Sequence, residues 1–517
     1  MPNSTPDDLP PRLRAACDLT VPSVREYGGR HEYDGVVPDY SREAIAALVA
    51  RLGRGEPLDD PHDEVHLAVF EDHLRVFYGE LQAHRRNPLI HLSALDLACY
   101  DREYAPAAER AAARDRHLAR WPEAMDTAVQ TLDLVPAPVA EALLGSVRGL
   151  AEGIPADTEA ASDAIAAQAR LVAHLEHVAE HGDPDGALGA DAIARLIGSA
   201  DGLAVDLDQL MKQADEERDR LLAMLAEATG RVALDGEAAE ARSPFDVCRA
   251  LVRDHPEADG VVDAARFWTR RAVDFTRERD LVPYHDGEWR VGVAPESRRW
   301  GTAFVTLAAP GEPEGPSWYH VSPPDPDWPA EDIDEWLEIF SSTTLPSITL
   351  HEVAPGHFSH GRAMRRVASP VRQALQSSGF VEGWAHYAEE LCIEEGFGGG
   401  DPRFTIGMCL EALVRVTRLA CAIGVHSGAM TVDDAARRFA ADTHLVGSAA
   451  RSEARRALFD PGYGRYTLGK LAIRDLRSRA RHGWGAQFSL RRFHSALFEL
   501  GAPPLGLMDA VLERGGT

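Results

Sequence analysis

The chain has 517 residues, which is long enough to bury a large core and to form two or three lobes. Hydrophobic residues make up 45% of it, as is ordinary for a globular protein. The formal net charge of -28 argues against nucleic-acid binding, because that function requires a basic surface.

The start of the chain predicts neither a signal peptide nor a membrane anchor. Residues 1–27 contain no basic stretch leading into an apolar run. No segment approaches the roughly 20 consecutive apolar residues that a membrane span requires, so we expect no membrane partner. The six cysteines show no CxxC spacing, which is typical of reduced thiols. We therefore predict a cytoplasmic protein, with residues 1–38 extended along its surface.

A long helical region follows. Between Ser41 and about Asp280, apolar residues recur at helical spacing, so residues 39–280 are predicted to be a helical N-terminal region. Ser41 is the predicted N-cap of its first helix, with Glu43 in the first turn. The longest predicted helix spans residues 191–228.

The pattern changes after about residue 281. The stretches 289–293, 303–307 and 318–322 are short, rich in β-branched and aromatic residues, and separated by Gly/Pro turns, so they predict a small sheet. The last of them is either an edge strand that pairs with an extended substrate, with His320 facing the cleft, or an ordinary packed strand. Helices resume at Glu331 and continue to the C-terminus. The predicted fold class is mainly α, as one continuous fold in which residues 281–517 carry the small sheet and the metal motif.

The stretch 348–357 contains a His–Glu pair, His351 and Glu352, six residues before His357. Six helical steps of about 100° would place the two histidines about 120° apart, so a regular helix could not aim both at one metal ion. Pro355 and Gly356 lie between them and permit a kinked turn that re-aims His357. Two imidazoles and one carboxylate are typical ligands of catalytic zinc.

The third ligand is expected 25 residues further along, at Glu382. Glu352 would then act as the base that takes a proton from water. Glu389 lies two helical turns after Glu382 and suits a role in orienting a ligand. His386, on the same face, is a rival ligand or a substrate contact, and His360 is a weaker candidate. A histidine-rich helix without metal is the alternative interpretation.

These residues resemble the bacterial family called domain of unknown function 885, whose pattern is HExxPGH followed by EGWAxYAE. The matching stretches here are 351–357 and 382–389, and further agreement lies in residues 418–426 and 453–462. The resemblance covers about residues 260–517 well, whereas no N-terminal motif is diagnostic.

That family is similar to the gluzincin peptidases. The resemblance implies a two-lobed helical fold with a deep cleft, zinc held by His351, His357 and Glu382, and Glu352 as general base. In such enzymes a C-terminal tyrosine often stabilises the oxyanion, which implies Tyr466 first and Tyr463 second.

A stretch of basic residues near the C-terminus contains His426 and Arg456. These two either meet a substrate carboxylate or form structural ion pairs. The expected activity is zinc-dependent hydrolysis of a peptide or small amide. Two alternatives stay open, namely a zinc enzyme acting on an amide or related bond in specialised metabolism, and a non-catalytic scaffold with a retained metal site. Manganese and cobalt also accept these ligand types, and the sequence leaves the oligomeric state open.

Overall fold

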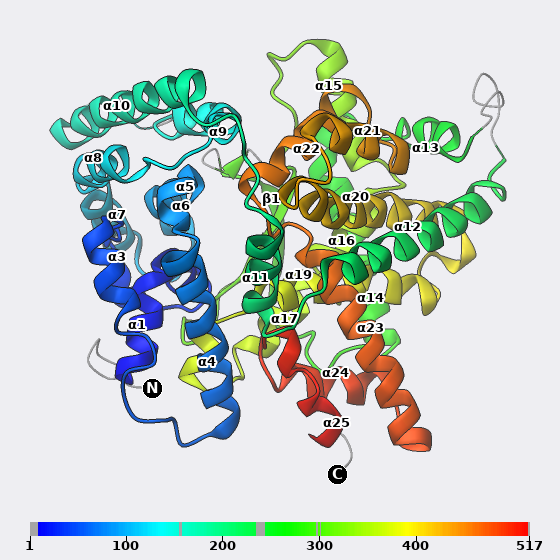
Figure 1. Cartoon of the computed structure of the whole chain (residues 1–517). Helices are drawn as coiled ribbons and strands as arrows, with labels where there is room; N and C mark the ends of the chain where they lie inside the picture. Colours follow the sequence, from blue (N-terminus) through cyan, green and yellow to red (C-terminus); the bar gives the residue numbers. More distant parts are fainter. Residues whose placement is uncertain are drawn as a thin grey trace.

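The computed structural model describes residues 9–152, 154, 158–233, 243–295, 298–299 and 301–514. This part of the chain is mainly helical and contains one small three-stranded sheet (Figure 1), as the sequence predicted. Within the described ranges, no helix is long and apolar enough to cross a membrane.

The helices of the first 181 residues gather on one side of the molecule (blue to cyan in Figure 1). Ser41 caps one of them as predicted, because its Oγ accepts a hydrogen bond from the Ala44 N–H at 3.3 Å. The helices of this N-terminal lobe are α1 (Pro11–Leu19), α2 (Val21–Glu26), α3 (Arg42–Val49), α4 (Pro61–Leu74), α5 (Ala83–Arg86), α6 (Pro88–Leu95), α7 (Ala107–Leu118), α8 (Trp121–Thr131), α9 (Ala137–Gly149) and α10 (Glu159–His181).

The N-terminal segment differs from the extended surface stretch that we predicted. Helices α1 and α2 lie within residues 9–38, and Leu13, Cys17 and Val24 are completely buried. Pro11 is compatible with helix α1 because it occupies the first turn, where a backbone N–H has no intrahelical partner. The proline content was therefore misleading: here it marks the start of a helix.

The remaining helices form the other side of the molecule. Residues 191–228 were predicted as one helix but form two, because Gly202 takes the left-handed conformation with φ 64° and ends the first. The helices are α11 (Ala190–Asp201), α12 (Leu207–Thr229), α13 (Pro244–Val252), α14 (Val261–Glu278), α15 (Ala330–Leu337), α16 (Leu345–Glu352), α17 (His357–Met364), α18 (Pro370–Ala374), α19 (Ser378–Glu394), α20 (Pro402–His426), α21 (Val432–Asp442), α22 (Gly447–Phe459), α23 (Arg465–Trp484), α24 (Leu490–Phe498) and α25 (Ala510–Arg514).

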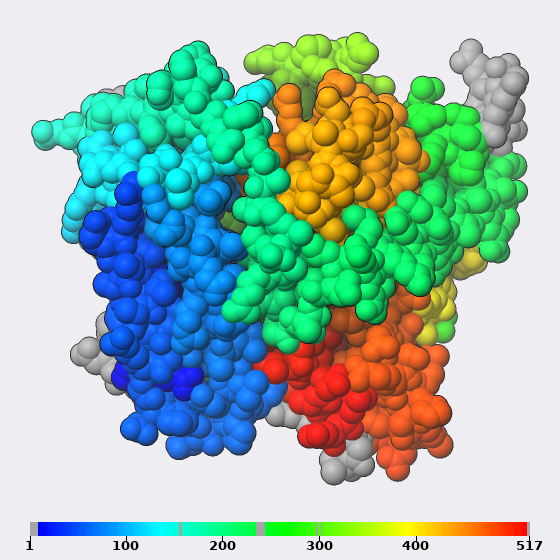
Figure 2. Space-filling model, viewed as in Figure 1, coloured from blue at the N-terminus to red at the C-terminus, as the bar shows by residue number. Residues whose placement is uncertain are grey.

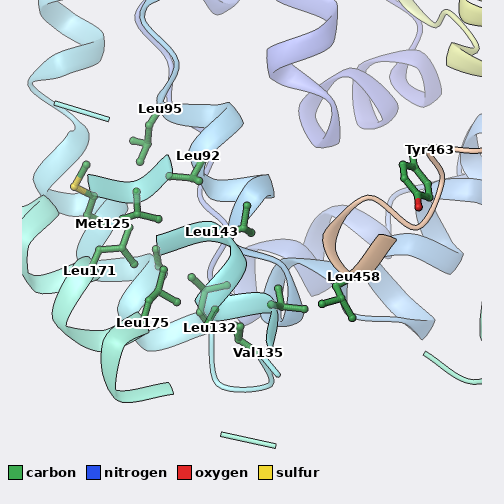
Figure 3. Packing of buried hydrophobic residues seen from close by; sticks show 14 of the residues in the cluster. Leu92, Leu95, Met125, Leu132, Val135, Leu143, Leu171, Leu175, Leu458 and Tyr463 are labelled. Atoms are coloured by element: carbon green, nitrogen blue, oxygen red, sulfur yellow. The ribbon is translucent and has the colours of Figure 1, made fainter. Parts of the chain in front are cut away.

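Helices α11 and α12, which belong to the predicted helical region 39–280, pack against the C-terminal part of the chain. Leu196 of α11 and Leu221 of α12 share a buried cluster with Leu413 of α20. Conversely, the core of the N-terminal lobe takes in residues from the other end of the chain: Figure 3 shows Leu458, on α22, at the edge of the cluster that includes Val135. Helical periodicity predicts that a helix exists but not which helix it packs against, so the sequence does not predict these contacts.

The sheet consists of β1 (Trp289–Val293), β2 (Ala303–Thr306) and β3 (Ser317–Val321) in the order β1-β3-β2. Strand β3 pairs in parallel with β1 and antiparallel with β2, so both of its edges are occupied and it is not the predicted edge strand. The hydroxyl of Tyr319 lies 3.4 Å from Thr349 Oγ1 on α16. Successive residues of a strand point to opposite faces, so His320 points away from α16, where it stacks on Trp318 at 5.7 Å.

Candidate metal centre

Helix α16 ends at Glu352 and α17 begins at His357, and the four residues between them turn the chain back on itself. The Gly356 N–H donates to the Leu350 carbonyl at 3.1 Å. A Cβ at position 356 would lie 1.9 Å from the carbonyl oxygen of His351, so this close approach requires glycine.

The turn brings the two histidines together. The rings of His351 and His357 lie at an angle of 89° with their centroids 4.7 Å apart. Trp384 of α19 fixes the turn from the other side, since its indole N–H donates to the Pro355 carbonyl at 2.9 Å. The predicted break in the helix is therefore present, and it re-aims His357 towards His351.

Both imidazoles face one oxygen of Glu382. Nε2 of His351 lies 3.5 Å from Glu382 Oε2, and Nε2 of His357 lies 3.6 Å from the same oxygen. Glu352 belongs to the same group, since one ligand atom each from His351, Glu352 and His357 lie within 4.8 Å of one another. Zinc bonds of about 2.0–2.1 Å in a tetrahedral arrangement place ligand atoms about 3.4 Å apart. The distances of 3.5 and 3.6 Å from the two Nε2 atoms to Glu382 Oε2 are close to this value.

Glu389 lies behind His351, where it was expected. The Nδ1–H of His351 donates to Glu389 Oε1 at 2.7 Å, which leaves Nε2 directed at Glu382. Arg415 Nη1 and Ser347 Oγ each donate to Oε2 of Glu389 at 3.0 Å. Burial alone would raise the pKa of Glu389, but Arg415 and His351 hold it well below its ordinary value. The sequence analysis missed Ser347, one turn before His351, and Arg415, because no local pattern links them to the motif.

Tyr466, the first candidate for oxyanion stabilisation, lies beside the cluster. Its ring stacks on His351 with centroids 6.3 Å apart. The guanidinium groups of Arg415, Arg418 and Arg465 surround the ring at 5.7, 5.8 and 5.6 Å from its centroid. Burial and the charge of Glu382 raise the pKa of the Tyr466 phenol, so its hydroxyl remains a proton donor at neutral pH.

Glycines bring Tyr466 to this position. A Cβ on Gly469 of α23 would lie 2.1 Å from the Gly379 carbonyl oxygen and 2.7 Å from Gly383 Cα, so α19 and α23 approach to backbone contact. Gly383 follows Glu382 directly, and Tyr466 lies one turn before Gly469. The glycine of the Glu-Gly-Trp sequence thus aligns a proposed ligand with the tyrosine.

Two other predicted histidines do not reach Glu382. Nδ1 of His386 lies 3.4 Å from Glu389 Oε1, so this buried ring contacts the carboxylate behind His351. His360 donates from Nε2 to the Gly501 carbonyl at 3.1 Å, inside an apolar cluster with Phe380.

Tyr463, His426 and Arg456 each have partners elsewhere in the fold. Tyr463 is completely buried, and its hydroxyl donates to the Glu453 carbonyl at 3.3 Å. The buried His426 ring donates from Nε2 to the Ala457 carbonyl at 2.7 Å and accepts at Nδ1 from a backbone N–H at 3.3 Å. Arg456 pairs with Asp460 at 2.9 Å, one helical turn away. All three side chains therefore have partners within the fold, and the spacing of residues in the sequence does not predict these partners.

A cavity of about 340 Å³ lies between the N-terminal helices and the rest of the chain, and none of His351, His357 and Glu382 lines it. Figure 2 shows that the linker between α10 and α11 crosses the surface between the N-terminal helices and the rest of the molecule, and Gly186 and Leu188 of this linker contribute to the lining of the cavity. Its lining is mostly apolar and includes Phe77 of the N-terminal lobe and Leu468 of α23. Arg465, whose guanidinium stacks on Tyr466 and pairs with Asp460 at 2.8 Å, also lines it. Arg465 is therefore the link between this apolar cavity and Tyr466.

Comparison with known proteins gives the class to which the chain belongs. Residues 22–512 match the family described as "bacterial protein of unknown function (DUF885)", and the chain belongs to this family. No curated protein matches the sequence significantly.

Two solved structures share the fold. A "putative lipoprotein of unknown function" from Shewanella oneidensis is 18% identical, with a TM-score of 0.75 over 98% of this chain and 100% of that one. The "putative lipoprotein" from Colwellia psychrerythraea is 17% identical, with a TM-score of 0.79 over 97% of each chain.

These two structures contradict the predicted cytoplasmic location, because both are described as lipoproteins. The prediction was wrong because it rested on the composition of residues 1–27 and on the spacing of the cysteines, and neither determines the location. All six cysteines are unpaired and buried, where a thiol packs as a small hydrophobic side chain. Cysteine usage therefore did not report the location here.

Proposed function

We propose that the protein is a zinc-dependent hydrolase of peptide or amide bonds. The observation that carries this proposal is the convergence of two imidazole Nε2 atoms on one Glu382 oxygen, at 3.5 and 3.6 Å, with Glu352 beside them. The donor set of two neutral imidazoles and a carboxylate is one that zinc prefers in hydrolases. His351, His357 and Glu382 would hold the ion.

Zinc in such a site supplies a Lewis acid that polarises the scissile carbonyl and lowers the pKa of water. The chain's own residues provide the remaining functions. Glu352 takes the proton from the attacking water and passes it to the leaving amine. Tyr466 donates a hydrogen bond to the carbonyl oxygen as negative charge develops there. Glu389 keeps the His351 ring in the orientation that presents Nε2.

The substrate is a peptide or small amide that enters between the lobes, in a cleft like that of the gluzincins. The apolar cavity of about 340 Å³ that Arg465 lines supports the entry between the lobes, because its size and lining suit an apolar side chain.

Metal content and hydrolysis of a quenched-fluorescent peptide pool test the proposal together. We expect about one zinc ion per chain in the wild type, and its loss in Glu382→Ala and His357→Ala. Glu352→Gln is expected to keep the zinc and to lose at least about a hundredfold in rate, since only the base is removed.

His386→Ala and His360→Ala are the matched controls, because both histidines lie near the cluster without facing Glu382, so both variants are expected to keep their zinc. A wild type without metal, or a His357→Ala variant that retains all of it, would overturn the ligand set. A Glu352→Gln variant as active as the wild type would overturn the assigned base.

A further inference from the structure

Asp201 is a buried carboxylate that lines the cavity of about 340 Å³. It is the last residue of α11, and only 4% of its surface is exposed. A buried charge costs free energy unless a counterion or hydrogen bonds compensate for it. The presence of this carboxylate in a mostly apolar cavity therefore needs an explanation.

One oxygen of Asp201 joins three segments of the fold. Oδ1 accepts from Ser377 Oγ, at the N-cap of α19, at 2.7 Å and from the Leu505 N–H at 3.3 Å. These two bonds fix the direction of the side chain. The amide oxygen of an asparagine would accept both of them equally well, so they do not explain why this side chain carries a charge.

The other oxygen, Oδ2, has no hydrogen-bond donor among the described residues. It lies against the first turn of α19, where a Cβ on Gly379 would be 2.4 Å from it. No cationic side chain of the described residues forms an ion pair with Asp201. Burial therefore raises the pKa of its carboxyl group, against the smaller effects of the Ser377 and Leu505 hydrogen bonds and of the charge of Arg465.

The other charged and titratable groups along the cavity do not supply the missing counterion. Arg465 lines the cavity but pairs with Asp460, at 2.8 Å. Burial lowers the pKa of His73 to about 4, so its ring is neutral at neutral pH. Arg86 is exposed, and solvent screens its charge. Within the described ranges, the negative charge of Asp201 is thus left without a cationic partner.

The chemistry of the lining indicates what kind of cation would fit. The apolar side chains along the cavity include those of Leu196, Ile197, Phe77 and Leu468. A metal ion would require several further oxygen or nitrogen ligands, and Asp201 belongs to no such cluster in the described part of the chain. A single carboxylate among apolar walls suits an organic cation, because its apolar part packs against those walls.

We propose that this cavity binds a ligand with an apolar body and a protonated amino group, and that the amino group donates a hydrogen bond to Oδ2 of Asp201. The ligand supplies the counterion that the described fold lacks. A free apolar amine and the apolar N-terminal residue of a peptide share this chemistry. The inference goes beyond the proposed hydrolysis, because none of the proposed zinc ligands lines the cavity.

The test compares phenethylamine with phenethyl alcohol, which have the same apolar body and differ in charge. Binding of each to the purified full-length chain is measured by isothermal titration calorimetry, in wild type and in Asp201→Asn. Asp206→Asn is the matched control, because it removes the same charge outside the cavity. Asp206 caps α12 by accepting from the Gln209 N–H at 3.0 Å, a bond that asparagine also accepts.

We expect the wild type and Asp206→Asn to bind phenethylamine at least about tenfold more tightly than phenethyl alcohol, the effect of one charge-assisted hydrogen bond. Asp201→Asn should bind the two probes equally and still melt cooperatively, since both Oδ1 bonds persist. Equal affinities in the wild type, a comparison that needs no variant, would overturn the inference. A preference for the amine that survives in Asp201→Asn would overturn it as well.

Leucyl-glycyl-glycine and its N-acetyl derivative then distinguish the two sources of the amino group. Binding of the free tripeptide, but not of the acetylated one, would assign the cavity to the amino end of a peptide. Binding of phenethylamine alone would assign it to a free amine. A protein that binds amines through Asp201 but cleaves no peptide would overturn the proposed hydrolase and leave this site standing.

Discussion

The two nitrogens of His351 have different partners, and this asymmetry is the main feature of the centre at the scale of single residues. Nδ1 donates to Glu389, whose other oxygen accepts from Arg415 and Ser347, so the ring is fixed from behind before any metal binds. Nε2 lies 3.5 Å from Glu382 Oε2. The negative charge of Glu389 therefore affects how strongly His351 would bind a metal ion, although Glu389 is not itself a proposed ligand.

Replacement of Glu389 by glutamine tests this role. The amide keeps the size of the side chain but loses the charge that Arg415 pairs with, so we expect zinc affinity to fall about 10–100-fold in a chelator competition titration. Glu411→Gln is the matched control, because Glu411 also pairs with Arg415, at 3.3 Å, without touching His351. Equal zinc affinities in the two variants would contradict the role given to Glu389.

At the scale of elements, the centre depends on two close backbone approaches, the turn at Gly356 and the crossing of α19 with α23. Both place a glycine where a methyl group would collide with a carbonyl oxygen. These two contacts determine how closely the helices that carry the proposed ligands approach one another.

The helix crossing gives a prediction about stability. In Gly469→Ala, the new methyl would lie 2.1 Å from the Gly379 carbonyl, so α19 and α23 must separate, and we expect a loss of about 1–3 kcal/mol in the free energy of unfolding. Gly483→Ala on the same helix has nothing within 4 Å and should stabilise the protein, by up to about 1 kcal/mol. Urea unfolding of both variants checks this, and equal effects would show that the crossing is not close-packed.

The sequence was most informative where a local pattern determines the local structure. The three strands, the Ser41 cap and the break between His351 and His357 follow from periodicity, capping chemistry and a Pro-Gly pair. Partners from distant segments were not predictable, because no local pattern encodes them. Arg415 reaches Glu389 from another helix, and Tyr463, three residues from Tyr466, is buried in a different core.

At the scale of the whole molecule, several buried histidines donate to backbone carbonyls, and two of them, His66 and His494, link segments more than 200 residues apart. The ring of His66 donates to the Leu375 carbonyl at 2.8 Å, and that of His117 to the Ala94 carbonyl at 2.9 Å. His91 and His494 donate to backbone carbonyls in the same way. Burial lowers the pKa of His66 and His91 to about 4 and that of His117 and His494 to about 3.

These shifts predict acid sensitivity. In the unfolded chain the same histidines titrate near pH 6.5, so between about pH 6.5 and 4 the unfolded state binds more protons and the folded state loses stability as the pH falls. Each fully differential proton contributes about 1.4 kcal/mol per pH unit. Urea unfolding at pH 7.5, 6.5, 5.5 and 4.5 should show a steep decline below 6.5, which His117→Gln makes shallower. A flat profile would contradict the prediction.

One histidine acts in the opposite direction. Burial opposes its protonation, but hydrogen bonds to Asp34 and Glu312 raise the pKa of His31 to about 9. Its contribution is complete below pH 6.5 and is lost as the pH rises through 9. We expect His31→Gln to flatten the alkaline side of the same profile without changing the acid side.

The sharing of the N-terminal core with α22 has a consequence for synthesis. As the chain leaves the ribosome, the helices up to α10 await Leu458 and Tyr463, which follow about 280 residues later. At roughly 5–20 residues per second this interval lasts on the order of half a minute, during which an apolar face is uncovered and prone to aggregation. We therefore expect chains truncated before α20 to be insoluble, and slower translation at low temperature to raise the yield of folded protein.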